Sequence, residues 1–409
     1  MIRERQGTDD DAVQGVIPRI VLEPATLEEA AAALCRSAAD RLAVTFVGGG
    51  TDLGLGGRPA RLDAVIRTGA LSRLVDHAPA DQVITAEAGM TLGSLRETLA
   101  LHRQWLALDP PFPDRATLGG VVAANAFGPR RARFGAARDL VLGVSIVRAD
   151  GTAAKGGGRV VKNVAGFDLP RLMVGSLGTL ALLTTVTFRV HPLPEARATV
   201  LFPGLDATQA WALTSGWRAA QLEPTSAAAI LDSDRFDLGV RFEGFESGVA
   251  DQTARMLGLG RKAGLAGARL GDVEAAEFWR RHDAVREGGS LRVKFSAPPS
   301  RLPEMARGWL PAVLGELSPS AAVLYPTLGL AFASGEPASA ASLVAGLHDA
   351  RVAVIAVGGS LVLCEAPVAV RRAFDPWGAP PPAIDLMRSL KERFDPDRRL
   401  SPGRFVGGI

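Results

Sequence analysis

Three glycine-bearing segments follow one another in the first half of the chain. They are VGGGTD at 47–52, TLGG at 117–120 and GSLGTL at 175–180. Glycine lets backbone N–H groups approach a charged ligand closely and accepts positive φ angles, so such segments can surround a diphosphate. One loop of this kind is weak support, because ordinary turns are also rich in glycine. Three in order, each beside an apolar strand or helix, predict one binding site for a phosphate-containing cofactor.

Two common phosphate-binding motifs do not fit the first segment. A dinucleotide fingerprint that begins at Gly48 needs a third glycine at position 53, where the chain has leucine. A Walker loop ends in Gly-Lys-Ser or Gly-Lys-Thr, and neither sequence occurs in the chain. For residues 48–57 taken alone, a flexible turn therefore remains the alternative interpretation.

Local patterns place these segments at the ends of regular elements. Thr26 followed by Glu29 is a capping box and predicts the start of a helix. Asp150-Gly151 favours a tight hairpin turn, whereas the proline-rich stretch at 109–113 requires an extended loop. The other expected elements of the first half are strands at 20–22, 44–47, 65–66, 83–86 and 180–190 and a helix at 91–102.

The second half of the chain alternates alanine-rich helices with strands. It begins after His191-Pro192-Leu193-Pro194, which we interpret as a domain boundary. The expected strands are 238–242 and 291–295, a hairpin of 352–356 with 361–364 across Gly358-Gly359 follows, and a helix is expected at 384–394. An antiparallel sheet with helices on one face fits this order, so the predicted fold class is α+β.

Composition limits the class of protein. The chain has 409 residues, 47% of them hydrophobic, and a net charge of +3 with acidic and basic residues intermixed, which argues against a nucleic-acid partner. The polar start lacks the apolar core of a secretory signal, and no apolar run is long enough to span a membrane. We therefore expect a cytoplasmic protein without direct membrane insertion, with any membrane association made through a partner. Cys35 and Cys364 lie in apolar patterns and are expected to be buried thiols.

Several stretches resemble a known family. They are 116–128, 135–140, 161–168, 375–378 and 394–404. Together with the glycine segments, they resemble the PCMH-type FAD-binding domain of the vanillyl-alcohol oxidase family, and more narrowly the FAD-binding E subunits of glycolate oxidases. This resemblance implies two α+β subdomains that hold FAD, plus a C-terminal antiparallel-sheet α+β domain. The implied organisation is a flexible N-terminus at 1–17, an FAD-binding domain at 18–194, an α+β cap or substrate-side domain at 195–375, and a C-terminal segment at 376–409 that returns to the FAD domain.

The resemblance also assigns roles to particular residues. The cofactor-binding residues that it implies are Gly48, Gly49, Gly50, Thr51 and Asp52 at the pyrophosphate, Asp109, Thr117, Leu118, Gly119, Gly120 and Asn125 in the second subdomain, Arg138 and Asp139 in a turn beneath the cofactor, and Gly178 and Leu182 near the adenosine or ring end. Covalent attachment in this family uses a histidine or cysteine beside the flavin ring. Because residues 47–58 contain neither, FAD is expected to be held noncovalently.

Candidates for substrate chemistry are few. A flavin accepts hydride from the carbon that bears a hydroxyl, while a base takes the hydroxyl proton and cations hold the carboxylate. The five histidines are dispersed in sequence, and we expect no metal site. His282 and Lys162 are the weak candidates for catalysis, set against an exposed helix face for His282 and a solvated side chain for Lys162.

The resemblance implies an FAD-dependent oxidoreductase that acts on CH–OH groups. The first hypothesis is an E-type subunit of a glycolate oxidase complex, which acts beside a D-type FAD subunit and an iron-sulfur F subunit to convert glycolate to glyoxylate. The second is a stand-alone FAD-dependent 2-hydroxy-acid dehydrogenase of the lactate type. The third is a non-catalytic scaffold subunit with an empty or merely structural flavin site.

Overall fold

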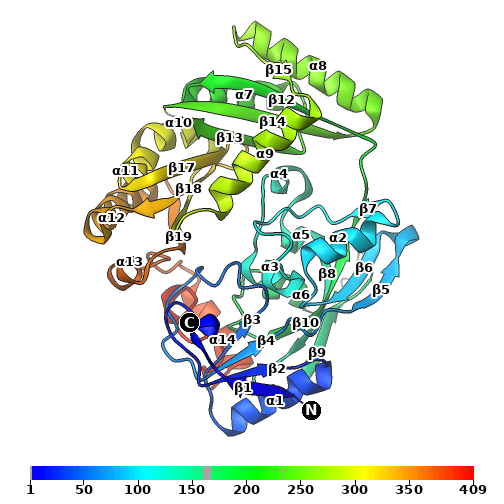
Figure 1. The fold of residues 1–409 in the computed structure, drawn as a ribbon, viewed down its shortest axis with the longest axis vertical. Helices are drawn as coiled ribbons and strands as arrows, with labels where there is room; N and C mark the ends of the chain where they lie inside the picture. Colours follow the sequence, from blue (N-terminus) through cyan, green and yellow to red (C-terminus); the bar gives the residue numbers. More distant parts are fainter. Residues whose placement is uncertain (1, 160–166, 233) are drawn as a thin grey trace. The chain divides into compact units, whose positions relative to one another are not determined.

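The computed structural model describes residues 2–159, 167–232 and 234–409. The chain forms two compact units (Figure 1). Unit 1 combines the residues up to Gly128 with Gly135–Pro192 and Ala379–Ile409, and unit 2 combines Pro129–Phe134 with Leu193–Gly378. Both ends of the chain therefore belong to unit 1.

The first sheet of unit 1 carries the first glycine segment at the end of one strand. Its order is β1 (Arg3–Gln6), β2 (Ile20–Glu23), β4 (Ala64–Arg67) and β3 (Val44–Val47), with β2, β4 and β3 parallel to one another. Helix α1 (Leu27–Ala39) links β2 to β3 and buries Ala30, Ala33 and Leu34. As the capping pattern predicted, Thr26 Oγ1 accepts a hydrogen bond from Glu29 N at 3.2 Å.

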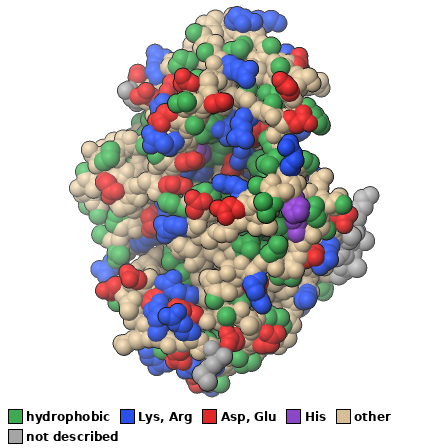
Figure 2. All heavy atoms as spheres, turned by 45° about the vertical axis from the view of Figure 1, so that its right-hand side comes forward, with side chains coloured by type: hydrophobic (Ala, Val, Ile, Leu, Met, Phe, Trp, Pro, Cys, Tyr) green, Lys and Arg blue, Asp and Glu red, His purple; other side chains and the backbone are tan. Residues whose placement is uncertain are grey.

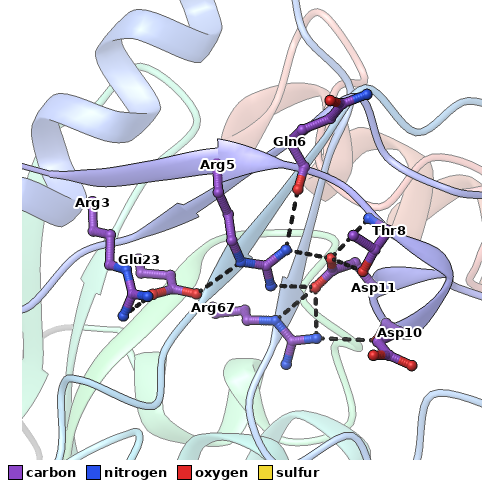
Figure 3. A network of polar contacts seen from close by, with 8 residues as sticks. All are labelled: Arg3, Arg5, Gln6, Thr8, Asp10, Asp11, Glu23 and Arg67. Carbon is purple, nitrogen blue, oxygen red and sulfur yellow. Dashed lines mark hydrogen bonds and ion pairs between the residues drawn. The ribbon is translucent and has the colours of Figure 1, made fainter.

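The N-terminal segment differs from the flexible terminus that the sequence suggested. Strand β1 pairs antiparallel with β2, and Asp11 fastens the following turn to the sheet (Figure 3). The Asp11 carboxylate accepts hydrogen bonds from Arg5 at 2.6 and 2.7 Å and from Arg67, at the end of β4, at 2.7 and 3.0 Å. These guanidinium contacts hold the pKa of Asp11 well below its ordinary value. Arg67 is far from Asp11 in sequence, so the local pattern did not reveal this anchor.

The second sheet of unit 1 is antiparallel and has five strands. Its order is β5 (Leu74–Ala78), β6 (Val83–Glu87), β10 (Leu182–Arg189), β8 (Val141–Val147) and β9 (Ala153–Gly157). The predicted turn joins β8 to β9, with Gly151 at φ 84°. Helices α2 (Leu92–Ala100), α3 (Leu118–Ala124) and α6 (Leu169–Met173) belong to the same part of the chain, and β7 (Gln104–Trp105) pairs with β11 (His191–Pro192).

The C-terminal segment returns to unit 1 and pairs with its first sheet. After the predicted helix, α14 (Ile384–Phe394), Val44 N donates to Arg399 O at 2.8 Å and Ser401 N donates to Val44 O at 2.7 Å. Lys391 of α14 is buried, and its Nζ donates to Asp395 Oδ2, Thr179 O and Leu400 O at 2.7 to 2.8 Å. The tail is thus fixed to β3 and to the third glycine segment.

Unit 2 is built on an antiparallel sheet of eight strands. Their order is β15 (Ala268–Arg269), β12 (Ala196–Leu205), β14 (Arg235–Gly244), β13 (Ser226–Asp232), β17 (Leu317–Tyr325), β18 (Leu330–Pro337), β16 (Leu291–Ser296) and β19 (Ser360–Glu365). Residues on one face of this sheet form the main core together with residues of four helices. These helices are α7 (Ala207–Ala219), α8 (Glu246–Lys262), α11 (Leu310–Leu314) and α12 (Ala340–Ala356). Helix α9 (Asp272–Glu287) contacts the opposite face, because Trp279 bonds Thr199 whereas the neighbouring Ala198 and Val200 belong to the core.

The structure contradicts two expectations, the hairpin in the second half of the chain and the burial of both cysteines. Residues 352–356 are not a strand of a hairpin but the end of α12, whose Leu343, Leu347 and Val354 are buried at helical spacing. Strand β19 pairs with β16 instead. The short apolar run at 352–356 is ambiguous in isolation, and the length of the helix before it decides the outcome. The cysteines also differ from expectation, because Cys35 is exposed and Cys364 is half-buried.

The surface carries charges of both signs. On the face drawn in Figure 2, Lys and Arg side chains are interspersed with Asp and Glu side chains. No helix among the described residues is long and apolar enough to cross a membrane.

Candidate functional site

The three glycine segments meet around one pocket in unit 1. The pocket encloses about 770 Å³, including the solvent-open space at its mouth. Its walls are the end of β3 with residues 48–53, the first turns of α3, and residues 177–183 that lead into β10. The lining residues are Thr45, Phe46, Gly48, Gly49, Gly50, Thr51, Asp52, Leu53, Thr68, Ala88, Thr117, Gly119, Gly120, Ala123, Ala124, Leu177, Gly178, Ala181, Leu182, Leu183 and Arg404.

The first segment needs glycine at three successive positions for two different reasons. A Cβ atom at Gly48 would lie 2.1 Å from Thr117 Oγ1, and one at Gly49 would lie 1.7 Å from the carbonyl oxygen of Arg115. Gly50 has room for a side chain but adopts φ 73°, which a side chain disfavours. The loop after β3 therefore packs against the chain just before α3. On the side of the pocket, the backbone of these three glycines is not covered by side chains of their own.

The second segment supplies small residues at the start of α3. Thr117 caps this helix, and its Oγ1 accepts from Gly120 N at 3.3 Å. Gly119 N donates to Ala88 O at 2.7 Å, and a Cβ atom at Gly119 would lie 2.8 Å from the Ala88 methyl. Because Gly119, Gly120 and Ala123 carry little or no side chain, a ligand can approach the helix backbone closely.

The third segment turns through two left-handed residues beside the pocket. Leu177 has φ 51° and Gly178 has φ 69°, and Leu177 N donates to Ala123 O at 2.9 Å. A Cβ atom at Gly178 would lie 2.9 Å from the Phe46 ring. A left-handed leucine is uncommon, and strained backbone of this kind clusters at ligand sites.

The pocket has the chemistry that FAD requires. Its bare glycine backbone can donate N–H groups to a diphosphate, and its lining otherwise consists mostly of apolar or small residues. The buried Oγ1 of Thr45 lines the pocket and has no hydrogen-bond partner among the described residues. Buried polar atoms are normally satisfied, so a polar ligand fits this orphaned hydroxyl. The buried Oγ of Ser401 also lacks a partner among the described residues, but Ser401 does not line the pocket; it follows Leu400, which bridges to Val44 of β3.

Most of the cofactor residues implied by the sequence lie around this pocket. They are Gly48, Gly49, Gly50, Thr51, Asp52, Thr117, Gly119, Gly120, Gly178 and Leu182.

The other implied residues are not among the lining residues, and two of them accept hydrogen bonds from backbone N–H groups. Asp109 Oδ1 accepts from Gly128 N at 2.9 Å, and Asp139 Oδ2 accepts from Ala136 N at 2.9 Å. Asn125 ends α3 with φ 51°, whereas Leu118 is buried. Arg138 forms a largely exposed ion pair with Asp139 at 3.8 Å.

Sequence reasoning missed part of the lining. The missed residues are Thr45, Phe46, Leu53, Thr68, Ala88, Ala123, Ala124, Leu177, Leu183 and Arg404. Most are apolar or small residues that local sequence does not distinguish from core residues. Arg404 is different, because it ends the Ser-Pro-Gly-Arg tail that the sequence had already singled out.

The two weak catalytic candidates have different outcomes. Lys162 lies outside the described residues. His282 belongs to α9 in unit 2 and is buried, not on an exposed helix face. Its Nε2 lies 2.7 Å from Tyr325 Oη, its Nδ1 lies 2.8 Å from Asp283 Oδ1, and Arg286 donates to the same Tyr325 oxygen. These contacts make His282 part of a closed polar network.

The buried histidine predicts an acid-sensitive stability. Burial lowers the pKa of His282 below its ordinary value, and the neighbouring Arg286 and Arg241 act in the same direction against Asp283. The unfolded chain therefore takes up a proton near pH 6.5 that the folded chain resists, so stability falls as the pH falls below this value.

Because of His282, we expect the free energy of unfolding to fall by up to about 1.4 kcal/mol for each unit by which the pH is lowered. Urea unfolding at pH 7.5 and 5.5 measures it, and His282→Gln should lose less stability on acidification than the wild type. The exposed His348→Gln is the matched control and should keep the wild-type loss. An unchanged acid loss in His282→Gln would contradict the prediction.

Two histidines that are separated in sequence meet in unit 1. The rings of His77 and His102 lie 4.7 Å apart, centroid to centroid, and His77 Nε2 lies 2.9 Å from Gln104 Oε1. Within the described part of the chain, no group of three or more metal-ligating side chains forms.

Comparison with known families supports the cofactor assignment. Residues 18–157 match the model of an FAD binding domain, and residues 369–405 match the C-terminal domain of FAD linked oxidases. Among solved structures, the chain is similar to an alkyldihydroxyacetonephosphate synthase, with a TM-score of 0.71 over 95% of this chain and 78% of that chain. At 18% identity, this likeness concerns the fold alone.

Curated relatives fall into related groups of enzymes. The glycolate oxidase subunit GlcE of Escherichia coli is 37% identical over 208 residues, which are 51% of this chain and 54% of that subunit. The D-lactate dehydrogenase of Archaeoglobus fulgidus is 37% identical over 42% of this chain and 39% of its own. An FAD-linked oxidoreductase of Mycobacterium tuberculosis is 26% identical over 95% and 91%. The chain thus matches about half the length of GlcE and less of the lactate dehydrogenase. Residues 18–157 thus match an FAD binding domain, and in its fold and its glycine-lined pocket the chain is similar to FAD-linked oxidoreductases.

Proposed function

We propose that this chain is the FAD-binding, E-type subunit of a glycolate oxidase complex, which oxidises glycolate to glyoxylate and passes the electrons to an acceptor. The observation that carries the proposal is the glycine-lined pocket in a chain 37% identical to GlcE over 208 residues. The proposed partners are a D-type FAD subunit and an iron-sulfur F subunit. The complex would lie in the cytoplasm, and membrane association would come through a partner.

The residues of the pocket have defined roles in this proposal. The N–H groups of residues 48–52 hold the diphosphate, and the Thr51 hydroxyl adds a donor. Thr117 and Gly119 set the position of α3, so that its small residues face the cofactor. When bound, FAD supplies the hydride acceptor for oxidation of the substrate carbon. Among the described lining residues there is no histidine or cysteine, which supports noncovalent binding.

A second candidate function is a stand-alone 2-hydroxy-acid dehydrogenase. The match to the D-lactate dehydrogenase of Archaeoglobus fulgidus favours it, because that enzyme is as similar in identity as GlcE. The two candidates differ in whether the isolated chain oxidises a hydroxy acid. They share the same pocket and the same noncovalent FAD.

The visible spectrum of the purified chain separates these functions. We expect a flavin spectrum, release of the flavin by acid precipitation, and no bleaching when glycolate or D-lactate is added without oxygen. Bleaching by glycolate should appear when the D-type and F subunits are co-expressed with the chain. Rapid bleaching of the isolated chain would support the stand-alone dehydrogenase. A colourless chain that FAD cannot reconstitute would contradict both functions and favour a scaffold.

A further inference from the structure

The C-terminal tail places a buried arginine in the wall of the FAD pocket. Arg404 is 3% exposed and lines the same pocket as the glycine loop. Among the described residues of this lining, Arg404 is the only lysine or arginine, and Asp52 is the only acidic residue. The family comparison places Arg404 at the end of the C-terminal match and outside the FAD binding domain match.

The guanidinium is held in place by backbone carbonyl groups of the loop that follows the pyrophosphate segment. Its Nη2 donates to Leu53 O at 2.9 Å and to Leu55 O at 2.7 Å, and Nη1 lies 3.4 Å from Gly57 O. The main chain adds a reciprocal contact, because Gly57 N donates to Arg404 O at 2.8 Å. Side chain and backbone together fix the orientation of Arg404.

The glycines at 56 and 57 are explained by this docking. A Cβ atom at Gly56 would lie 2.4 Å from Arg404 O, and one at Gly57 would lie 2.3 Å from Gly403 O. The glycine-rich loop therefore contacts two parts of the structure. Residues 48–53 line the pocket, and Gly56 and Gly57 pack against the backbone of the C-terminal tail.

The other end of the chain holds the same loop. Gln14 Nε2 donates to Gly56 O at 2.9 Å and lies 3.3 Å from both Leu53 O and Gly54 O. The loop at 53–57 is thus ordered by contacts from both terminal segments, of which only Arg404 carries a charge into the pocket wall.

We propose that Arg404 is an FAD-binding residue that acts on the diphosphate, so that FAD binding and docking of the tail depend on each other. A guanidinium stays charged at every physiological pH and forms strong hydrogen bonds to phosphate oxygens. In a partly buried pocket, this charge is screened less than it would be in water. By reciprocity, FAD that contacts Arg404 must stabilise the docked tail by as much as the tail strengthens FAD binding. The proposal rests on the FAD site and not on the choice of substrate.

The test compares ligands with and without phosphate on apoprotein variants. Apoprotein is titrated with FAD, ADP and riboflavin, using flavin fluorescence for FAD and riboflavin and calorimetry for ADP. Arg404→Met should weaken FAD and ADP by about tenfold to a hundredfold and riboflavin by less than twofold. Arg404→Lys should fall between Arg404→Met and the wild type. The matched control is Arg398→Met, which removes an exposed tail arginine paired with Glu392 at 3.1 Å and should leave all three affinities unchanged.

Two results would overturn the proposal. One is an unchanged FAD affinity in Arg404→Met, and the other is an equal loss for FAD and riboflavin, which would make Arg404 a structural support of the loop. A readout on the wild type covers the case in which Arg404→Met does not fold. Hydrogen exchange at residues 395–409 should slow when ADP is added and stay unchanged with riboflavin, and no slowing with ADP would count against the proposal. If the wild type bound no FAD, the proposed function would fail instead.

Discussion

Replacing Gly49 with alanine is expected to remove bound FAD and to destabilise the protein. The added Cβ atom would lie 1.7 Å from the Arg115 carbonyl oxygen and 2.6 Å from its carbon, and both are backbone atoms that cannot rotate away. The loop after β3 must therefore move from α3. We expect a loss of about 1–3 kcal/mol in the free energy of unfolding, or more, and an FAD affinity at least about a hundredfold weaker. Urea unfolding and the flavin-to-protein absorbance ratio measure the two effects.

Two further alanine variants separate steric clash from backbone conformation. Gly50 has space for a Cβ atom, with the nearest atom at 3.7 Å, but its φ of 73° strains alanine, so Gly50→Ala should lose about 1 kcal/mol and part of the FAD affinity. Gly216 lies within α7 with nothing within 4 Å, so Gly216→Ala should keep FAD and gain up to about 1 kcal/mol. A Gly49→Ala protein with full flavin content and wild-type stability would show that the loop does not pack as described.

Replacing Lys391 with methionine is expected to release the C-terminal tail. Lys391 and Asp395 are both buried, and Lys391 Nζ also donates to the carbonyl groups of Thr179 and Leu400. Burial lowers the pKa of Lys391, and Asp395 opposes this shift. Methionine fills a similar volume but leaves the Asp395 carboxylate without its cation, which costs about 3–5 kcal/mol for a buried pair. The free energy of unfolding in urea, measured on the FAD-free protein, gives this loss.

A matched exposed pair provides the control. Arg280 donates to Glu277 at 2.6 Å on the exposed surface of α9, so Arg280→Met should change the free energy of unfolding by less than about 1 kcal/mol. Removing both buried charges, in Lys391→Met with Asp395→Leu, should recover part of the loss, because no uncompensated carboxylate remains. Equal effects of Lys391→Met and Arg280→Met would mean that the buried pair does not hold the tail.

Much of the local structure could be predicted from residue patterns. The strands at 44–47 and 238–242, the hairpin turn at Asp150-Gly151 and the helix at 384–394 all follow from short-range signals, and the structure confirms each of them. The wrong hairpin at 352–364 shows where such signals fail. A five-residue apolar run is compatible with a strand and with a buried helix. Only the packing of α12 on the unit 2 core distinguishes these two structures.

The candidate site divides in the same way. The order and spacing of the glycine segments, with the resemblance that they carry, predicted an FAD binding domain and many of the residues that line the pocket. Glycine can be interpreted from the sequence alone, because few positions other than tight turns and close backbone approaches require its conformational freedom.

Only the tertiary structure decided which residues far apart in sequence contact one another. Arg404 reaches Leu53 and Leu55 across 351 and 349 positions of sequence, and Lys391 reaches Thr179 across 212. It also decided that His282 is buried beside Tyr325. The sequence around an arginine, a lysine or a histidine does not indicate which residue its side chain contacts. Burial and charge pairing depend on which segments the fold brings together.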